Sequence, residues 1–113
     1  MRKSVQTDVE AFDLTQIPLS AEMRLGRIFK EGESKYGKGN WRNGAGNIAY
    51  QLERANHAIK HLKIYIHMLE HGEYIGEVRD DEMSEDDLAK VAWFCVTQME
   101  LERLQTAKST NKA

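Results

Sequence analysis

The most regular hydrophobic pattern in the chain lies between Asn47 and Gly72. Aliphatic residues and one alanine recur there at alternating spacings of four and three; they are Ile48, Leu52, Ala55, Ile59, Leu62, Ile66 and Leu69. This spacing predicts a helix of about seven turns with one apolar side, which we expect to face the core. A second row on roughly the opposite side comprises Tyr50, Arg54, His57, His61, Ile64, Tyr65 and Met68. We expect protein against both sides of the helix and any chemistry on the second.

Two further helices are predicted, one before and one after this long helix. The first should span about residues 21–36, with Ser20 as its N-cap and Gly37 as its C-terminal stop. Its expected inward residues are Leu25, Ile28 and Phe29. The last should span 84–105, because Ser84 fits a start resembling a capping box. Its expected core stripe is Leu88, Val91, Ala92, Cys95 and Met99.

The remaining segments suggest one helical domain with two extensions. Residues 1–19 are expected to form an N-terminal arm, because Pro18 prevents a helix from running through it. Residues 20–106 form the domain, and the polar residues 107–113 are expected to be a disordered tail. The predicted fold class is all-α: a small bundle of three main helices with a Gly/Trp loop after the first. We expect a homo-oligomer, in which the second side of the long helix contacts another protomer.

Composition narrows the class of protein. The 113 residues are 41% hydrophobic and 30% charged, which is typical of one soluble globular domain. The net charge of −2 argues against binding to duplex DNA. No segment resembles a signal peptide or a membrane span, so we expect a cytoplasmic protein without a membrane partner. The single cysteine, Cys95, is expected to be a buried thiol.

The loop over residues 37–46 combines glycines with a tryptophan and basic side chains. Trp41 is flanked by Asn40 and Arg42, and Lys35 and Lys38 lie shortly before it. A tryptophan in such a loop is suited to stack on a nucleotide base. The alternative is that Trp41 folds back and fills a gap in the core.

The long helix and its neighbours supply candidate metal ligands. His57 and His61 are four residues apart, so their rings share one helix face, where they could bind a transition metal or simply pack against a neighbour. Glu31 and Glu33 end the first helix, while Asp86 and Asp87 begin the last. Carboxylates beside a histidine would suit Mg²⁺ or Mn²⁺ and a bound phosphate. Helix capping alone would also explain Asp86 and Asp87.

Together these segments resemble a known family. The stretch FDLTQIPLSAEMRLGRIFKEGESKYGKGNW, then His61 before Gly72-Glu73, then EDDLAKVAWF, resembles the phage-associated dATP/dGTP diphosphohydrolase N-terminal-like domain. The resemblance covers about residues 12–102, and its best marker is Lys35-Tyr36-Gly37 followed by Asn40-Trp41. It implies an all-α domain, similar to the all-α nucleotide pyrophosphohydrolases, located in the host cytoplasm if a phage encodes it.

The resemblance also implies a function, and the candidate site residues below follow from it together with the acids, histidines and basic aromatic loop described above. The implied activity is metal-dependent hydrolysis of purine deoxynucleoside triphosphates, with Mg²⁺ or Mn²⁺ as the cofactor. The candidate catalytic residues are Glu33, His61 and Asp86. The candidate metal ligands are Glu33, His57, His61 and Asp86. The residues expected to bind the nucleotide are Lys35, Tyr36, Lys38, Asn40, Trp41, Arg42 and Arg54.

The sequence departs from the family pattern in its last helix. Asp87, Lys90 and Phe94 stand where many relatives carry histidine and asparagine, and the ExxE…ExxD pattern of related pyrophosphohydrolases is missing. Two alternatives to an enzyme therefore stay open. The protein could capture a nucleotide, including a signalling nucleotide, without hydrolysing it. It could also be a helical oligomeric scaffold in which the histidines and Trp41 only pack.

Overall fold

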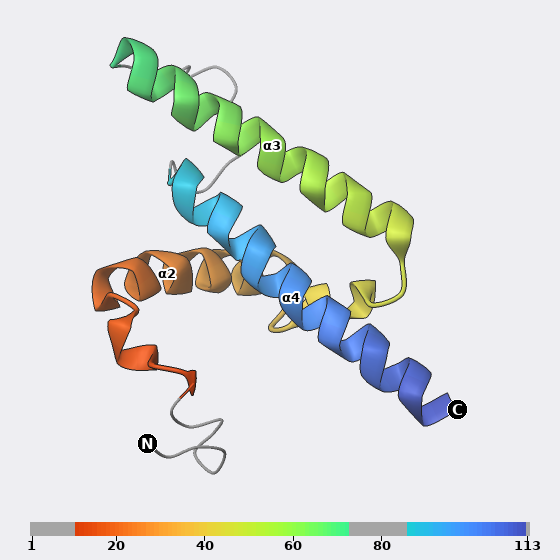
Figure 1. The fold of residues 1–113 in the computed structure, drawn as a ribbon. Coiled ribbons are helices and arrows are strands. Elements are labelled where there is room, and N and C mark those ends of the chain that lie inside the picture. The colour runs from red at the N-terminus through yellow and green to blue at the C-terminus, as the bar shows by residue number, and fades with distance from the viewer. Residues whose placement is uncertain (1–10, 73–85, 113) are drawn as a thin grey trace.

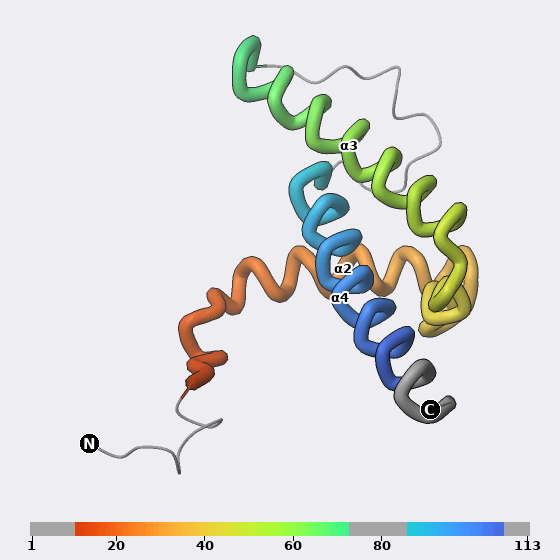
Figure 2. Tube along the Cα trace, turned by 45° about the vertical axis from the view of Figure 1, so that its right-hand side comes forward, coloured from red at the N-terminus to blue at the C-terminus, as the bar shows by residue number. Residues whose placement is uncertain are grey.

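Three α-helices make up the fold, as predicted. The computed structural model describes the backbone of residues 11–72 and 86–112 and the side chains as far as 107. In chain order the elements are η1 (Leu14–Gln16), α2 (Leu19–Tyr36), η2 (Asn40–Gly44), α3 (Ile48–His71) and α4 (Asp87–Lys112). No strand occurs in this described part. α3 and α4 lie side by side and run in opposite directions, with α2 across them (Figures 1 and 2).

The ends of the long helix α3 follow from local sequence. The side chain of Asn47 accepts a hydrogen bond from the backbone N–H of Tyr50 at 3.0 Å, which caps the first turn. At the other end Gly72 adopts φ 76°, a left-handed conformation that glycine takes at little cost. Both ends match the prediction, because they depend only on residues next to them in the chain.

The other two helices have ends that differ from the prediction, and α4 begins at Asp87 instead of residue 84. α2 begins at Leu19, directly after Pro18, so Ser20 lies in its first turn instead of capping it. It ends before Gly37, as predicted. α4 continues to Lys112, so the backbone of residues 107–112 is helical where we expected a disordered tail. Ser84 and its capping-box-like start lie outside the described residues.

The buried side of α3 is the polar one. Within the described part of the chain, the prediction that its apolar stripe faces the core is wrong. The residues buried on this helix are Gln51, Arg54, Ala58, His61 and Ile64. In contrast, Leu52 is 65% and Leu69 is 63% exposed. The reason lies in α4, whose opposing side carries hydrogen-bonding groups for these polar residues.

The residues buried on α4 also differ from the predicted core stripe, and the N-terminal arm is exposed. Ala89, Thr97 and Leu101 are the buried residues in the middle of α4, whereas Met99 is 63% exposed. Cys95, expected to be a buried thiol, is exposed. The described part of the arm also leaves its large apolar side chains uncovered; they are Phe12, Leu14, Ile17 and Leu19. None of the described helices is long and apolar enough to span a bilayer.

Candidate functional site

One cavity of about 850 Å³ lies where α2, η2, α3 and α4 converge. This volume is within the range typical of small-molecule sites. Trp41 and His61 both line it, so the cavity connects the tryptophan loop with the histidines of α3. All seven residues expected to bind a nucleotide lie on its wall; they are Lys35, Tyr36, Lys38, Asn40, Trp41, Arg42 and Arg54.

Aromatic rings form one side of the cavity. Phe29 of α2 packs edge-on against Trp41, with ring centroids 6.3 Å apart, and against Trp93 of α4, at 6.2 Å. Trp41 is partly buried by this contact, yet it still borders the cavity. The guanidinium of Arg42 lies over the Trp41 ring, 4.5 Å from its centroid. Trp41 therefore packs against Phe29 and also presents surface to the cavity, while its stacking on a base stays a prediction.

The loop that carries Trp41 is fastened by uncharged amides. Gln51 of α3 donates to the carbonyl of Gly44 at 2.9 Å, and the N–H of Gly46 donates to Gln105 of α4 at 2.8 Å. Gln98 in turn donates to Gln51 at 2.9 Å. At Gly44 a Cβ atom would stand 2.4 Å from the ring of Tyr50, so only glycine fits there. These contacts fix the loop against the α3–α4 pair.

Arg54 places a buried positive charge in the cavity wall. Only 9% of the residue is exposed, and its guanidinium is 5.1 Å from the Trp93 ring centroid and 5.2 Å from that of Phe94. It donates to Gln98 at 3.0 Å and to the hydroxyl of Thr97. Its Nε finds no hydrogen-bond partner, and no carboxylate of the described residues pairs with it.

The electrostatics of Arg54 reflect that environment. Burial lowers the pKa of the guanidinium from its usual value, against an opposing effect of Tyr50. Arginine nevertheless stays protonated in proteins, so the charge persists. A buried cation without a carboxylate partner is costly unless an anion from outside the chain approaches it.

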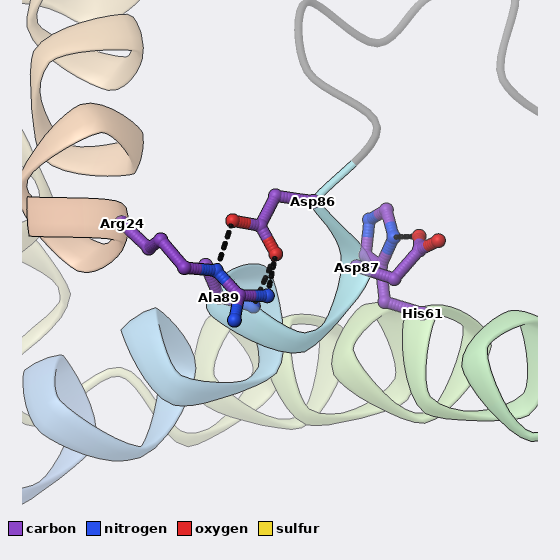
Figure 3. A network of polar contacts seen from close by, with 5 residues as sticks. All are labelled: Arg24, His61, Asp86, Asp87 and Ala89. Atoms are coloured by element: carbon purple, nitrogen blue, oxygen red, sulfur yellow. Dashed lines mark hydrogen bonds and ion pairs between the residues drawn. The ribbon is translucent and has the colours of Figure 1, made fainter. Parts of the chain in front are cut away.

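A buried histidine and aspartate join α3 to α4 beside the cavity (Figure 3). His61 Nδ1 lies 2.7 Å from Asp87 Oδ1, and the two residues are each 1% exposed. The Nε2 atom of His61 is 3.1 Å from Nε2 of His57, which is more exposed and also lines the cavity. Because one nitrogen must donate to the other, a single proton lies between the two rings.

Asp86 points the other way from its neighbour Asp87 (Figure 3). Its carboxylate accepts from Arg24 of α2 at 2.9 Å and 2.6 Å, and it also caps the N–H of Ala89 at 3.2 Å. The hydrogen bonds from Arg24 hold the pKa of Asp86 below its usual value. Asp86 therefore links α2 to α4 and does not line the cavity.

The four candidate metal ligands are thus only partly brought together. Glu33, His57 and His61 line the cavity, whereas Asp86 is engaged by Arg24. The carboxylate of Glu33 lies 3.3 Å from Lys30 Nζ. Among residues 11–72 and 86–112, no three side chains of the metal-binding types form a group that could hold an ion. The predicted set does not constitute a preformed metal centre within that part of the chain.

Several cavity residues were missed from the sequence. Lys90, Trp93 and Phe94 of α4 line the cavity together with Phe29, and Asp87 supports His61. Trp93 and Phe94 lie beside the expected core stripe of α4, and Asp87 was considered as a helix cap or as one of the carboxylates near a histidine. Their common signal is a polar and aromatic row beside the expected core stripe of α4.

Comparison with known proteins identifies the family. The family model for "dATP/dGTP diphosphohydrolase, N-terminal" matches residues 2–111. No curated protein and no solved structure matches the chain significantly. The matched range covers nearly all of the 113 residues and includes every element around the cavity. The chain therefore belongs to the family of dATP/dGTP diphosphohydrolase N-terminal domains.

Proposed function

We propose that the cavity binds a purine deoxynucleoside triphosphate and that the protein hydrolyses one of its phosphoanhydride bonds. The observation that carries this proposal is the buried guanidinium of Arg54, which has an unpartnered Nε in the wall of a cavity lined by aromatic rings. A nucleotide offers the two complementary groups, an anion for the cation and a flat base for the rings.

The charge around the cavity supports a phosphate-bearing ligand. Six lysine or arginine side chains line it against three glutamates; the basic ones are Lys30, Lys35, Lys38, Arg42, Arg54 and Lys90. In this proposal Arg54 and Lys90 take the phosphates, because Arg54 lies about one turn before His57 on α3 and Lys90 about one turn after Asp87 on α4. Trp41 then meets the base at the opposite end, next to the basic loop. The cations would also stabilise negative charge that builds up during phosphoanhydride cleavage.

The histidine pair supplies a base for the attacking water. With His61 donating from Nδ1 to Asp87, its Nε2 accepts a hydrogen bond from Nε2 of His57. In this proposal the histidine pair takes up the proton of a water molecule as the water oxygen attacks phosphorus. The leaving phosphate departs with the electron pair of the broken P–O bond. The positive charge left on the two rings is stabilised by the carboxylate of Asp87.

A divalent cation belongs to the proposal only in a limited sense. The described residues do not form a preformed Mg²⁺ or Mn²⁺ centre, and no step is assigned to a protein-bound ion. Mg²⁺ commonly binds through substrate phosphates and one or two carboxylates. Of the predicted ligands, Glu33 is the carboxylate on the cavity wall that could take that part.

The direct test is product analysis. The protein is incubated with each deoxynucleoside triphosphate, with and without Mg²⁺ or Mn²⁺, and nucleotides and pyrophosphate are separated by chromatography. Purine substrates should be consumed, and His57→Asn should lower turnover while leaving binding within about threefold. His67→Asn is the matched control, since His67 lies on the same helix but does not line the cavity. Absence of any product over hours, with binding intact, would contradict hydrolysis.

Capture without hydrolysis is the second candidate. It is favoured by Asp86, because the carboxylate expected to act in catalysis is occupied by two hydrogen bonds from Arg24. Calorimetry followed by chromatography of the recovered ligand separates the two functions. Tight binding with the triphosphate recovered intact would favour capture, and a lack of binding to any nucleotide would remove both candidates.

A further inference from the structure

The side of the α3–α4 pair that faces away from the cavity is apolar and uncovered. Six aliphatic residues of α3 there are between 40% and 65% exposed; they are Ile48, Leu52, Ile59, Leu62, Ile66 and Leu69. Only five hydrophobic residues of the described chain are buried, which is a small core for three helices. A contiguous exposed apolar surface of this extent usually marks a contact with another protein surface.

α4 continues this surface. At about 100° per residue, Leu88, Cys95 and Met99 fall on the side of α4 opposite Lys90 and Trp93, which line the cavity. Leu88 is 38% and Met99 63% exposed, and Cys95 is exposed as well. On α3 the exposed row likewise lies opposite Tyr50 and His57, which line the cavity, so both exposed rows face away from the cavity. We call this surface the outer face; it consists of Ile48, Leu52, Ile59, Leu62, Ile66, Leu69, Leu88, Cys95 and Met99.

The spacing on α3 indicates what kind of surface would cover the outer face. The alternation of four and three residues from Ile48 to Leu69 is the a/d repeat of three consecutive heptads. Such a seam packs against another helix, whose side chains interdigitate with its own. Within the described chain α4 packs elsewhere, against the side of α3 that carries Arg54 and His61. The seam is therefore available to a helix from another molecule.

We propose that the outer face is closed by the outer face of a second copy of the chain, forming a two-fold symmetric dimer. A helix of 24 residues is about 36 Å long, and two adjacent helices are about 20 Å wide, which gives about 700 Å² per protomer. Specific, stable interfaces bury about 600–1,000 Å² per partner, so the estimated area lies within that range. A second copy also brings the same repeat, as a two-fold contact requires.

The charges on the outer face agree with self-association. Its nine side chains are aliphatic, thioether or thiol groups, so burying them against each other desolvates no charge among them. The contact is on the opposite side of α3 from the one expected from the sequence, because that other side is already occupied by α4. The cavity faces away from the contact, so the dimer leaves its lining residues unchanged.

The test is the mass in solution of the full chain and of two matched double variants. The first variant, Leu62→Glu with Ile66→Glu, places charge on the outer face. The second, Leu14→Glu with Ile17→Glu, changes an equally aliphatic and exposed pair in the arm. By light scattering, the wild type and the arm variant should be dimers with twice the chain mass of 13.0 kDa. The outer-face variant should be a monomer with the mass of one chain. Circular dichroism checks that the helices are retained.

Three outcomes would overturn the proposal. A monomeric wild type would mean that something else covers the face, such as another segment of this chain or a different protein. A dimer that survives both glutamates would place the contact elsewhere. If the variant loses its helices, the test is the rate at which Cys95 of the wild type reacts with a thiol reagent. This rate should rise as the protein is diluted and the dimer separates. A reaction rate that does not depend on protein concentration would contradict the dimer.

Discussion

Nδ1 of His61 lies 2.7 Å from Oδ1 of Asp87, and this contact joins the middle of α3 to the first residue of α4. With both residues almost fully buried, the carboxylate fixes the orientation of the imidazole and leaves Nε2 directed at His57. The pair therefore has a structural role, because it holds two helices together, and a proposed chemical role, because it supports the histidine pair as a base. Substitutions can separate the effect on stability from the effect on turnover.

Asp87→Asn should lower turnover more than stability. The amide oxygen can still accept from His61, so the helices stay joined, but the negative charge that stabilises the protonated ring pair is lost. We expect kcat to fall by about 100-fold, with nucleotide affinity within about threefold. Steady-state kinetics combined with calorimetry measure both. Asp87 would have a structural role alone if the variant melted at a lower temperature and lost activity only in proportion to the fraction of protein that is unfolded.

Arg54→Met should weaken nucleotide binding without weakening the fold. Methionine replaces a buried cation that has no carboxylate partner in the described chain, so the free energy of unfolding should stay level or rise by about 1 kcal/mol. The dissociation constant for the triphosphate should rise at least about tenfold. Urea unfolding and calorimetry are the measurements. The control is Arg103→Met, which removes an exposed guanidinium paired with Glu100. Similar affinity loss in both variants would argue against the assignment.

Substitutions at Trp41 distinguish base stacking from core packing. Trp41→Phe keeps a ring against Phe29 and should preserve affinity for the purine nucleotide within about threefold. Trp41→Ala should weaken binding of the nucleotide by about 1–3 kcal/mol, but should leave binding of inorganic triphosphate unchanged. Calorimetry with both ligands gives the comparison. If Trp41 only packs, the alanine variant will melt earlier while the two ligands keep their relative affinities.

The ion pair between Arg24 and Asp86 should contribute to stability in a defined pH range. Its hydrogen bonds lower the pKa of Asp86, so the contribution is present above the pKa of the unfolded chain and is lost as pH falls through the lower folded pKa. Asp86→Asn retains a good N-cap and should destabilise by about 0.5–1 kcal/mol at neutral pH. The difference from wild type should disappear in strong acid. A difference that is the same at every pH in urea titrations would refute the ionic origin.

Two glycine substitutions should have opposite signs. Gly44→Ala brings a Cβ to 2.4 Å from the Tyr50 ring, which is below any relaxed contact, and should destabilise by about 1–3 kcal/mol. Gly26→Ala, in the middle of α2, meets nothing within 4 Å and should stabilise by about 0.5–1 kcal/mol. Thermal unfolding of both variants provides the test. Destabilisation by Gly26→Ala would show that a neighbour absent from this structure covers that position.

Local features of the fold could be predicted, because neighbouring residues determine them. Asn47 and Gly72 mark the ends of α3 through their own hydrogen bonding and backbone conformation. The composition of residues 37–46 likewise marked a loop with basic and aromatic side chains, which does border the cavity. The orientation of each helix could not be predicted in the same way. An apolar stripe indicates that some surface covers it, but not whether that surface belongs to the same chain.

The choice between Asp86 and Asp87 shows the same limit at one site. Adjacent residues at a helix start point about 100° apart, so one faces α2 and the other faces α3. Which carboxylate meets His61 depends on the rotation of α4, and that rotation is set by contacts far along the chain, such as Gln98 with Gln51. From the sequence alone, the carboxylate that caps α4 therefore cannot be distinguished from the one that contacts His61.

The fastening of the Trp41 loop has a consequence for how the protein responds to its surroundings. Gln51, Gln98 and Gln105 do not titrate and attract no counterions, so acid or salt leaves this anchor intact. The other end of the cavity is held by the contact between His61 and Asp87, which shares no residue with this anchor. The tryptophan loop is therefore supported independently of that contact.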